Sequence, residues 1–83
     1  MRIIDIRGLR PLVKNRSVNL YAFRVKDGYT LNAYRRTKRT ANDEPTHCLK
    51  AVNGPKQPRV FKTADSLMNY LKNNLWGESV TFI

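Results

Sequence analysis

The residues best suited to chemistry in this sequence are His47 and Cys48, which are adjacent. A thiol beside an imidazole could be a nucleophile with its general base. The segment 46–52 around them is predicted to be a strand, and successive side chains of a strand point to opposite faces of a sheet. The two groups therefore cannot hydrogen-bond to each other, and we expect no catalytic dyad.

The sequence also offers few residues that could form a metal site or an acid–base site. Zinc sites use three or four ligands at recognisable spacings, whereas the chain has one His and one Cys. Asp27, Asp43 and Glu44 fall in predicted turns and loops that hold no carboxylate pair for acid–base work. We expect no catalytic residues, no metal and no cofactor. A toxin-like small ribonuclease that uses His47 with Lys, Arg and Tyr side chains remains an alternative.

Positive charge is the dominant feature of the composition. The 83 residues include 16 Lys and Arg against 6 Asp and Glu, which gives a net charge of +10 and an isoelectric point near 10.4. Such an excess of positive charge is repulsive within a folded protein, so it is typical of proteins that bind a polyanionic partner. Nucleic acid is the first candidate partner, ahead of an acidic protein or an anionic membrane.

The charge is also unevenly distributed along the chain. Residues 1–62 carry a balance of +11, and residues 63–83, with Lys72 against Asp65 and Glu78, carry −1. A recognition helix in the major groove needs cations on its outer face. The helix predicted in the second segment lacks them, so we expect it to support a sheet that makes the contacts.

A β-hairpin is the clearest element that could position these cations. Apolar and polar residues alternate over 18–26 and 29–36, on either side of Asp27-Gly28. A two-residue loop at Asp27-Gly28 would mix polar side chains into the apolar face, so we predict a three-residue loop, 26–28, with a left-handed Gly28. This register gathers Tyr21, Phe23, Val25, Tyr29, Leu31 and Ala33 on one face. It leaves a face free for a ligand that carries Leu20, Ala22, Arg24, Thr30, Asn32, Tyr34 and Arg36.

The remaining pattern predicts an α+β fold. From Thr63, a natural N-cap, Leu67, Leu71 and Leu75 recur at helical spacing and predict a helix over about 64–75. Gly8 and Pro11 predict a turn after the first strand. We therefore expect one domain over 1–83, an antiparallel sheet of about five strands packed against one helix. The strands outside the hairpin are expected near 3–6, 46–52, 58–62 and 79–83.

The predicted interface is the hairpin face and the basic loop that follows it. The segment 35–40 holds four cations in six residues, and phosphate contacts from it would make binding steeply salt-dependent. Asn32, Arg24 and Thr30 could hydrogen-bond base edges, and Tyr34 could stack on an unpaired base. Alternatively, Tyr34 covers a neighbour across the strand and Asn32 is an ordinary surface residue. The predicted nucleic-acid-binding residues are Arg24, Lys26, Asn32, Tyr34, Arg35, Arg36, Lys38 and Arg39.

The order of hairpin, further strand and helix also resembles a known type of module. With the helix opening Phe61-Lys62-Thr63-Ala64-Asp65-Ser66-Leu67, residues 20–75 resemble the small three-stranded-sheet-plus-helix modules at the amino termini of some phage and transposon integrases. The chain is similar as well to small accessory proteins of plasmids and phages. The resemblance to integrases implies a sheet that lies in the major groove.

Together these features predict a cytoplasmic regulatory or accessory protein of phage or plasmid type that binds nucleic acid, with DNA favoured over RNA. The single cysteine agrees with an intracellular location, and no apolar run is long enough to span a membrane. Pairing of a terminal strand across a two-fold axis would allow a homodimer. The alternative partner class is a protein, in which case the chain is an inhibitor that docks on an acidic or nucleic-acid-binding partner.

Overall fold

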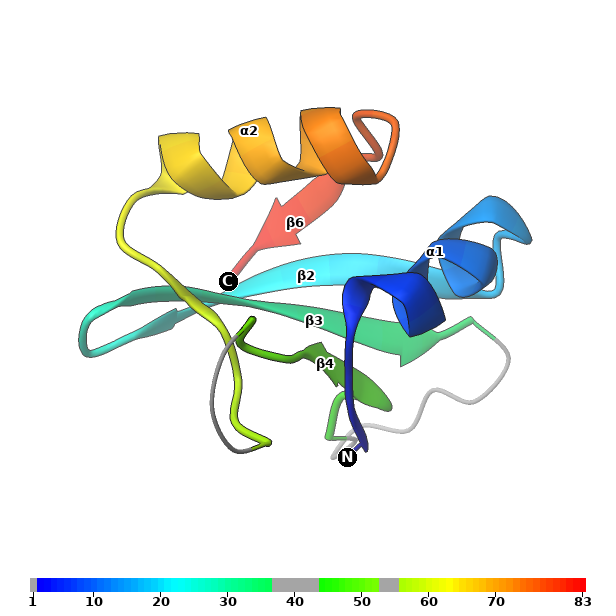
Figure 1. Ribbon diagram of the computed structural model, residues 1–83, viewed down its shortest axis with the longest axis horizontal. Coiled ribbons are helices and arrows are strands. Elements are labelled where there is room, and N and C mark those ends of the chain that lie inside the picture. The colour runs from blue at the N-terminus through cyan, green and yellow to red at the C-terminus, as the bar shows by residue number, and fades with distance from the viewer. Residues whose placement is uncertain (1, 37–43, 53–55) are drawn as a thin grey trace.

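The computed structural model describes residues 2–36, 44–52 and 56–83. Two helices lie on the same side of one twisted sheet (Figure 1). The elements in chain order are β1 (Arg2–Ile4), α1 (Ile6–Lys14), β2 (Val18–Val25), β3 (Gly28–Arg35), β4 (His47–Leu49), β5 (Val60–Phe61), α2 (Ala64–Asn74) and β6 (Val80–Phe82). Among the described residues, no helix is both long and apolar enough to cross a membrane.

The sheet is mixed, which corrects the antiparallel sheet expected from the sequence, while the α+β class is confirmed. Its strand order is β1-β4-β3-β2-β6, with β5 also beside β3. The hairpin β2–β3 is antiparallel, but β1 pairs with β4 and β6 pairs with β2 in parallel. Neither parallel pair is consecutive in the chain. The hairpin separates β1 from β4 and α2 precedes β6, so neither pair needs the tight turn that joins antiparallel neighbours.

The helix α1 was not predicted, and it replaces the expected turn at Gly8 and Pro11. Asp5 is its N-cap, because the carboxylate accepts a hydrogen bond from the Gly8 N–H at 2.9 Å. Pro11 lies inside the helix and is exposed. Leu9 and Val13 are four residues apart on the face that packs on the core. Burial of this face therefore outweighs the two residues that disfavour a helix.

The hairpin register differs from the predicted one. Val25 pairs with Gly28, so the loop is the two residues Lys26 and Asp27. The predicted three-residue loop is wrong. The face toward the helices carries small and aliphatic side chains, which are Val18, Leu20, Ala22, Leu31 and Ala33, all buried. The opposite face carries Tyr21, Phe23, Val25, Thr30, Asn32 and Tyr34.

The core lies between the sheet and the helices. The predicted helix in the second half is confirmed as α2, and Leu67 and Leu71 of this helix and Leu75 at its C-cap are completely buried. Its N-terminus is closed by a capping box, in which Thr63 and Ser66 each accept the other's backbone N–H through their hydroxyl groups. Arg10 of α1 donates from Nε to the Asn74 carbonyl oxygen at 3.2 Å and from Nη2 to its Oδ1 at 3.1 Å, which links the two helices.

Substitution of Gly28 tests how closely β3 and β5 approach. Gly28 has φ +149°, and a Cβ there would overlap the carbonyl oxygen of Phe61. We expect Gly28→Ala to lower the free energy of unfolding by roughly 2–4 kcal/mol, measured by urea denaturation. Gly77→Ala is the matched control, because Gly77 has φ +67° but open space around it, and it should cost about 1 kcal/mol. Equal costs would contradict the close approach.

Candidate nucleic-acid interface

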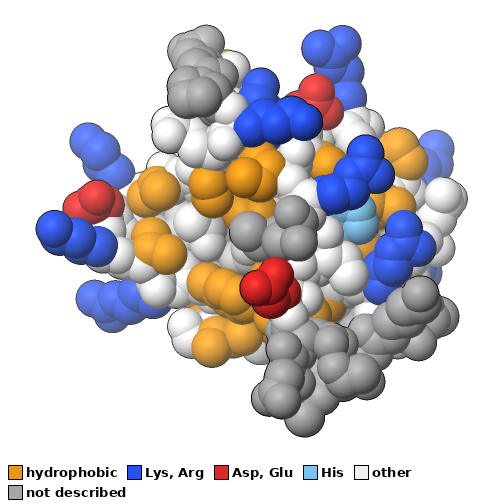
Figure 2. Space-filling model, turned by 90° about the horizontal axis from the view of Figure 1, so that it is seen from below, with side chains coloured by type: hydrophobic (Ala, Val, Ile, Leu, Met, Phe, Trp, Pro, Cys, Tyr) orange, Lys and Arg blue, Asp and Glu red, His pale blue; other side chains and the backbone are white. Residues whose placement is uncertain are grey.

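Neither of the described helices lies over the face of the sheet away from α1 and α2, and we call this face the open face. Figure 2 shows it from below, with hydrophobic side chains gathered in the middle and Lys and Arg side chains around the edge. The strand pairing puts Tyr21, Phe23 and Val25 of β2 there, next to Thr30 and Asn32 of β3. Among the described residues, the open face is therefore apolar and aromatic at its centre with cations toward its edge, which corrects the basic sheet face expected from the sequence.

Three aromatic rings form a cluster on the open face. Tyr34 meets Tyr21 edge-on, with ring centroids 5.0 Å apart, and lies 6.2 Å from the ring of Phe23. All three side chains are half-buried. Tyr34 thus covers neighbours on the adjacent strand, which was the alternative role considered for it. The cluster makes a continuous aromatic surface along β2.

A hollow of about 320 Å³, here called the central hollow, lies beside Phe23. Its lining comes from four separate segments of the chain and is mostly apolar. The lining residues are Phe23, Val25, Thr30, Asn32, Glu44, Pro45, Cys48 and Pro58. A second hollow, of about 400 Å³, shares Val25, Thr30 and Pro58 with it and extends to Lys26 at the hairpin tip. A shallow track therefore runs along the open face.

The polar residues at the floor of the central hollow are occupied with each other. Thr30 and Asn32 are only 7% and 3% exposed. The Asn32 amide donates to the hydroxyl of Thr30 at 3.0 Å and to its carbonyl oxygen at 3.2 Å. These two side chains were expected to read base edges from the surface. The structure instead makes them a buried, internally bonded pair.

His47 and Cys48 lie on opposite faces of the sheet, because His47 pairs with Ala33 and Cys48 with Asn32. Cys48 lines the central hollow, and burial raises the pKa of its thiol. A raised pKa keeps the sulfur in its unreactive thiol form. Among the described residues, no group of three His, Cys, Asp or Glu side chains could hold a metal ion.

The predicted cations do not form one cluster. Arg24 alternates with Phe23 and Val25 and so lies on the helix side, where it lines a hollow with Lys62 and Thr63. Lys26 is at the hairpin tip. Arg35 and Arg36 are at the other end of β3, roughly 23 Å away at about 3.3 Å per residue. The predicted residues Lys38 and Arg39 lie outside the described part of the chain.

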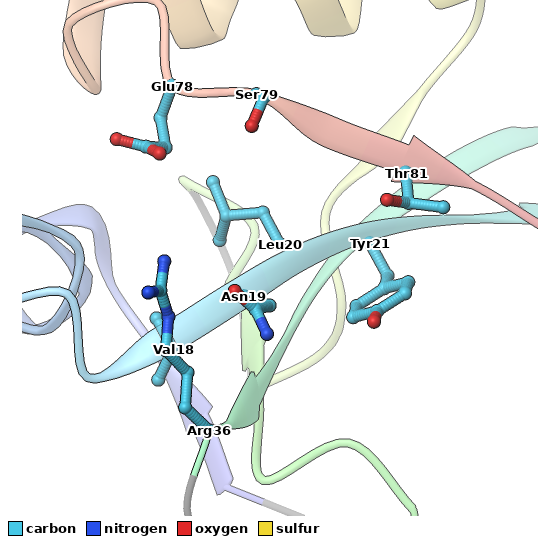
Figure 3. A pocket seen from close by; sticks show the side chains of 8 residues that line it. All are labelled: Val18, Asn19, Leu20, Tyr21, Arg36, Glu78, Ser79 and Thr81. Carbon is cyan, nitrogen blue, oxygen red and sulfur yellow. The ribbon is translucent and has the colours of Figure 1, made fainter.

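Arg36 faces the sheet edge rather than the open face. It lines a polar hollow of about 250 Å³ between β2 and the segment that leads into β6. Figure 3 shows its guanidinium and the Glu78 carboxylate turned toward one another across this hollow. Arg36 therefore lines a hollow that also holds an acidic residue.

A cationic corner that the sequence did not predict lies at the other edge of the sheet, and it consists of Arg2, Arg35 and His47. Arg2 pairs with His47, which pairs in turn with Ala33, two residues before Arg35 on the same face. The pKa of His47 is lowered by burial first and then by the charges of Arg35 and Arg2. By this pairing the corner is on the Ala33 side of the sheet edge, opposite Cys48, and the charges of Arg2 and Arg35 act on the same imidazole. The sequence did not indicate Arg2 as a site residue, because β1 and β4 are distant in the chain.

The lowered pKa of His47 predicts acid sensitivity. Above the ordinary value of 6.5 both folded and unfolded chains hold the imidazole neutral. As the pH falls below 6.5 the unfolded chain takes up the proton first, so the free energy of unfolding decreases until the folded-state pKa is passed. Urea denaturation between pH 7.5 and about 5 should show this loss, and His47→Gln should flatten the curve in that window. The same pH slope in both proteins would refute it.

Comparison of the chain with protein-family models, with curated proteins and with solved structures gives no match in any of the three. The resemblance to integrase modules and to accessory proteins of plasmids and phages stays a prediction. The charge and the geometry of the open face are therefore the features that bear on function.

Proposed function

We propose that this protein binds nucleic acid, without catalysing a reaction on it, through the open face of its sheet and the cations at the ends and edges of the sheet. The observation that carries the proposal is an aromatic face that neither described helix covers, in a sheet whose edge brings the guanidinium groups of Arg2 and Arg35 together around His47. A surface of aromatic side chains flanked by cations suits nucleic acids, because rings stack on bases and cations neutralise phosphates.

The net charge of +10 supports the same partner class. Each phosphate that the protein neutralises releases condensed counterions, so the charge contributes affinity and rapid association at low salt. The helix α2 contributes little to this, because its charged side chains are Asp65 and Lys72. We therefore place the phosphate contacts at the ends of the hairpin and at the corner formed by Arg2 and Arg35.

A protein partner is the second candidate function. It is favoured by the apolar centre of the open face, where Val25 and Val60 are 37% and 44% exposed. The two candidates differ in their dependence on salt. Binding to phosphate weakens steeply as salt rises, whereas docking of an apolar surface does not.

Charge reversal at two exposed positions tests the proposed placement. Arg35→Glu and Lys72→Glu change the net charge equally, but Arg35 is at the cationic corner and Lys72 is in α2. We expect Arg35→Glu to weaken binding to a fluorescent oligonucleotide by about tenfold and to reduce the log–log salt slope by about one. Lys72→Glu should stay within about twofold of the parent protein.

The readout is fluorescence anisotropy over a salt series with single- and double-stranded DNA and RNA. Equal losses from both variants would overturn the placement of the contacts. If no nucleic acid binds even at low salt, the proposed function itself is wrong, and a protein partner becomes the better candidate.

A further inference from the structure

The chemistry of the central hollow favours the base over the phosphate of a nucleotide. Its walls are formed by Phe23, Val25, Pro45 and Pro58, which offer no hydrogen-bond donor from their side chains. A phosphate placed there would lose its water without compensation. Glu44, the charged residue among those described around this hollow, would also repel it. A neutral, planar, apolar-faced group such as a nucleobase meets neither penalty.

Phe23 belongs both to the aromatic cluster and to the wall of the central hollow. Its ring is held from one side by Tyr34 at 6.2 Å, and Tyr34 is held in turn by Tyr21 at 5.0 Å. A ring fixed in this way loses little conformational freedom when a base stacks on it. The volume of about 320 Å³ is at the lower end of the range for small-ligand pockets, about 300–1,000 Å³, which suits a single ring system.

Duplex DNA could not use these features. A duplex keeps the faces of its bases stacked and presents only their edges in the grooves, where polar side chains must reach them. The polar residues at the centre of the open face, Thr30 and Asn32, are buried and bonded to each other. The surface that remains there is aromatic and apolar, and it matches the faces of unpaired bases.

From these observations, and resting on the nucleic-acid binding proposed above, we infer that the open face is selective for single strands. One unpaired base stacks on Phe23 and enters the central hollow. The phosphates on either side of that base lie toward Lys26 at the hairpin tip in one direction and toward the sheet edge that carries Arg2 and Arg35 in the other. DNA and RNA share this chemistry, and the experiment includes both.

An abasic strand separates stacking from phosphate contact. Three probes of about 12 nucleotides are compared at one salt concentration: a single strand, the same strand with stable abasic sites throughout, and a duplex. The abasic strand keeps every phosphate. We expect the protein to bind the ordinary single strand at least about tenfold more tightly than the abasic strand, for DNA, RNA or both. The duplex should also bind less tightly than the single strand when affinities are compared per phosphate.

Two leucine variants assign the effect to a face. Phe23→Leu removes the ring but keeps apolar volume on the open face, and it should weaken single-strand binding by about tenfold while the salt slope is unchanged. Phe82→Leu is the matched control, because Phe82 is a 42% exposed aromatic paired with Ala22 on the helix side. It should leave binding unaltered. Unfolding midpoints of both variants verify that they are folded.

The outcomes distinguish this inference from the nucleic-acid binding on which it rests. Equal affinity for abasic and ordinary strands, or equal effects of the two leucine variants, would refute base stacking and leave phosphate binding intact. Tighter binding of the duplex per phosphate would also refute selectivity for single strands. Failure to bind any of the three probes at low salt would refute both proposals.

Discussion

The pairing of Val25 with Gly28 is the constraint on which the rest of the structure depends. Side chains alternate between faces along a strand, so this one pairing decides which residues of both long strands meet the helices. The close approach of Gly28 to the carbonyl of Phe61 brings β5 alongside β3 and holds the register from its far side. Small residues, Ala22 and Ala33, then face the helices, and the aromatic residues are left on the open face.

The sequence predicted the elements of the sheet better than their pairing. The hairpin and α2 follow from alternation and from leucines at helical spacing, which are local signals. The register was wrong because both faces of β2 carry apolar residues, so hydrophobicity alone could not choose between them. The choice depends on shape, since small side chains such as Ala22 let a helix lie close to the sheet. Similarly, Gly8 and Pro11 predicted a turn where α1 forms, because the stability of α1 comes from tertiary burial of Leu9 and Val13.

The candidate site was only partly predictable, because it is assembled from distant segments. Charge indicated a polyanionic partner, and Tyr34 was correctly placed on an open strand face. The central hollow, however, joins Phe23 with Pro45, Cys48 and Pro58, and the cationic corner needs the parallel pairing of β1 with β4. Thr30 and Asn32 were misjudged for a simpler reason. Residues two apart on a strand share a face and can bond to each other, which removes both from the surface.

The distribution of charge means that, in the proposed mode of binding, short-range contacts would have to orient the strand. Cations are not confined to one side, because the exposed residues Arg7 and Lys14 of α1 lie on the helix side. A polyanion is therefore attracted toward both faces of the protein. The helix side, however, is covered, and Arg59 there lies over the rings of Phe61 and Tyr70 at 4.8 and 4.6 Å from their centroids. Among the described residues, the open face adds the cluster of Tyr21, Phe23 and Tyr34 to the positive potential. In the proposed mode of binding, attraction would bring the strand to the protein, and contact with the rings of the open face would determine how it lies.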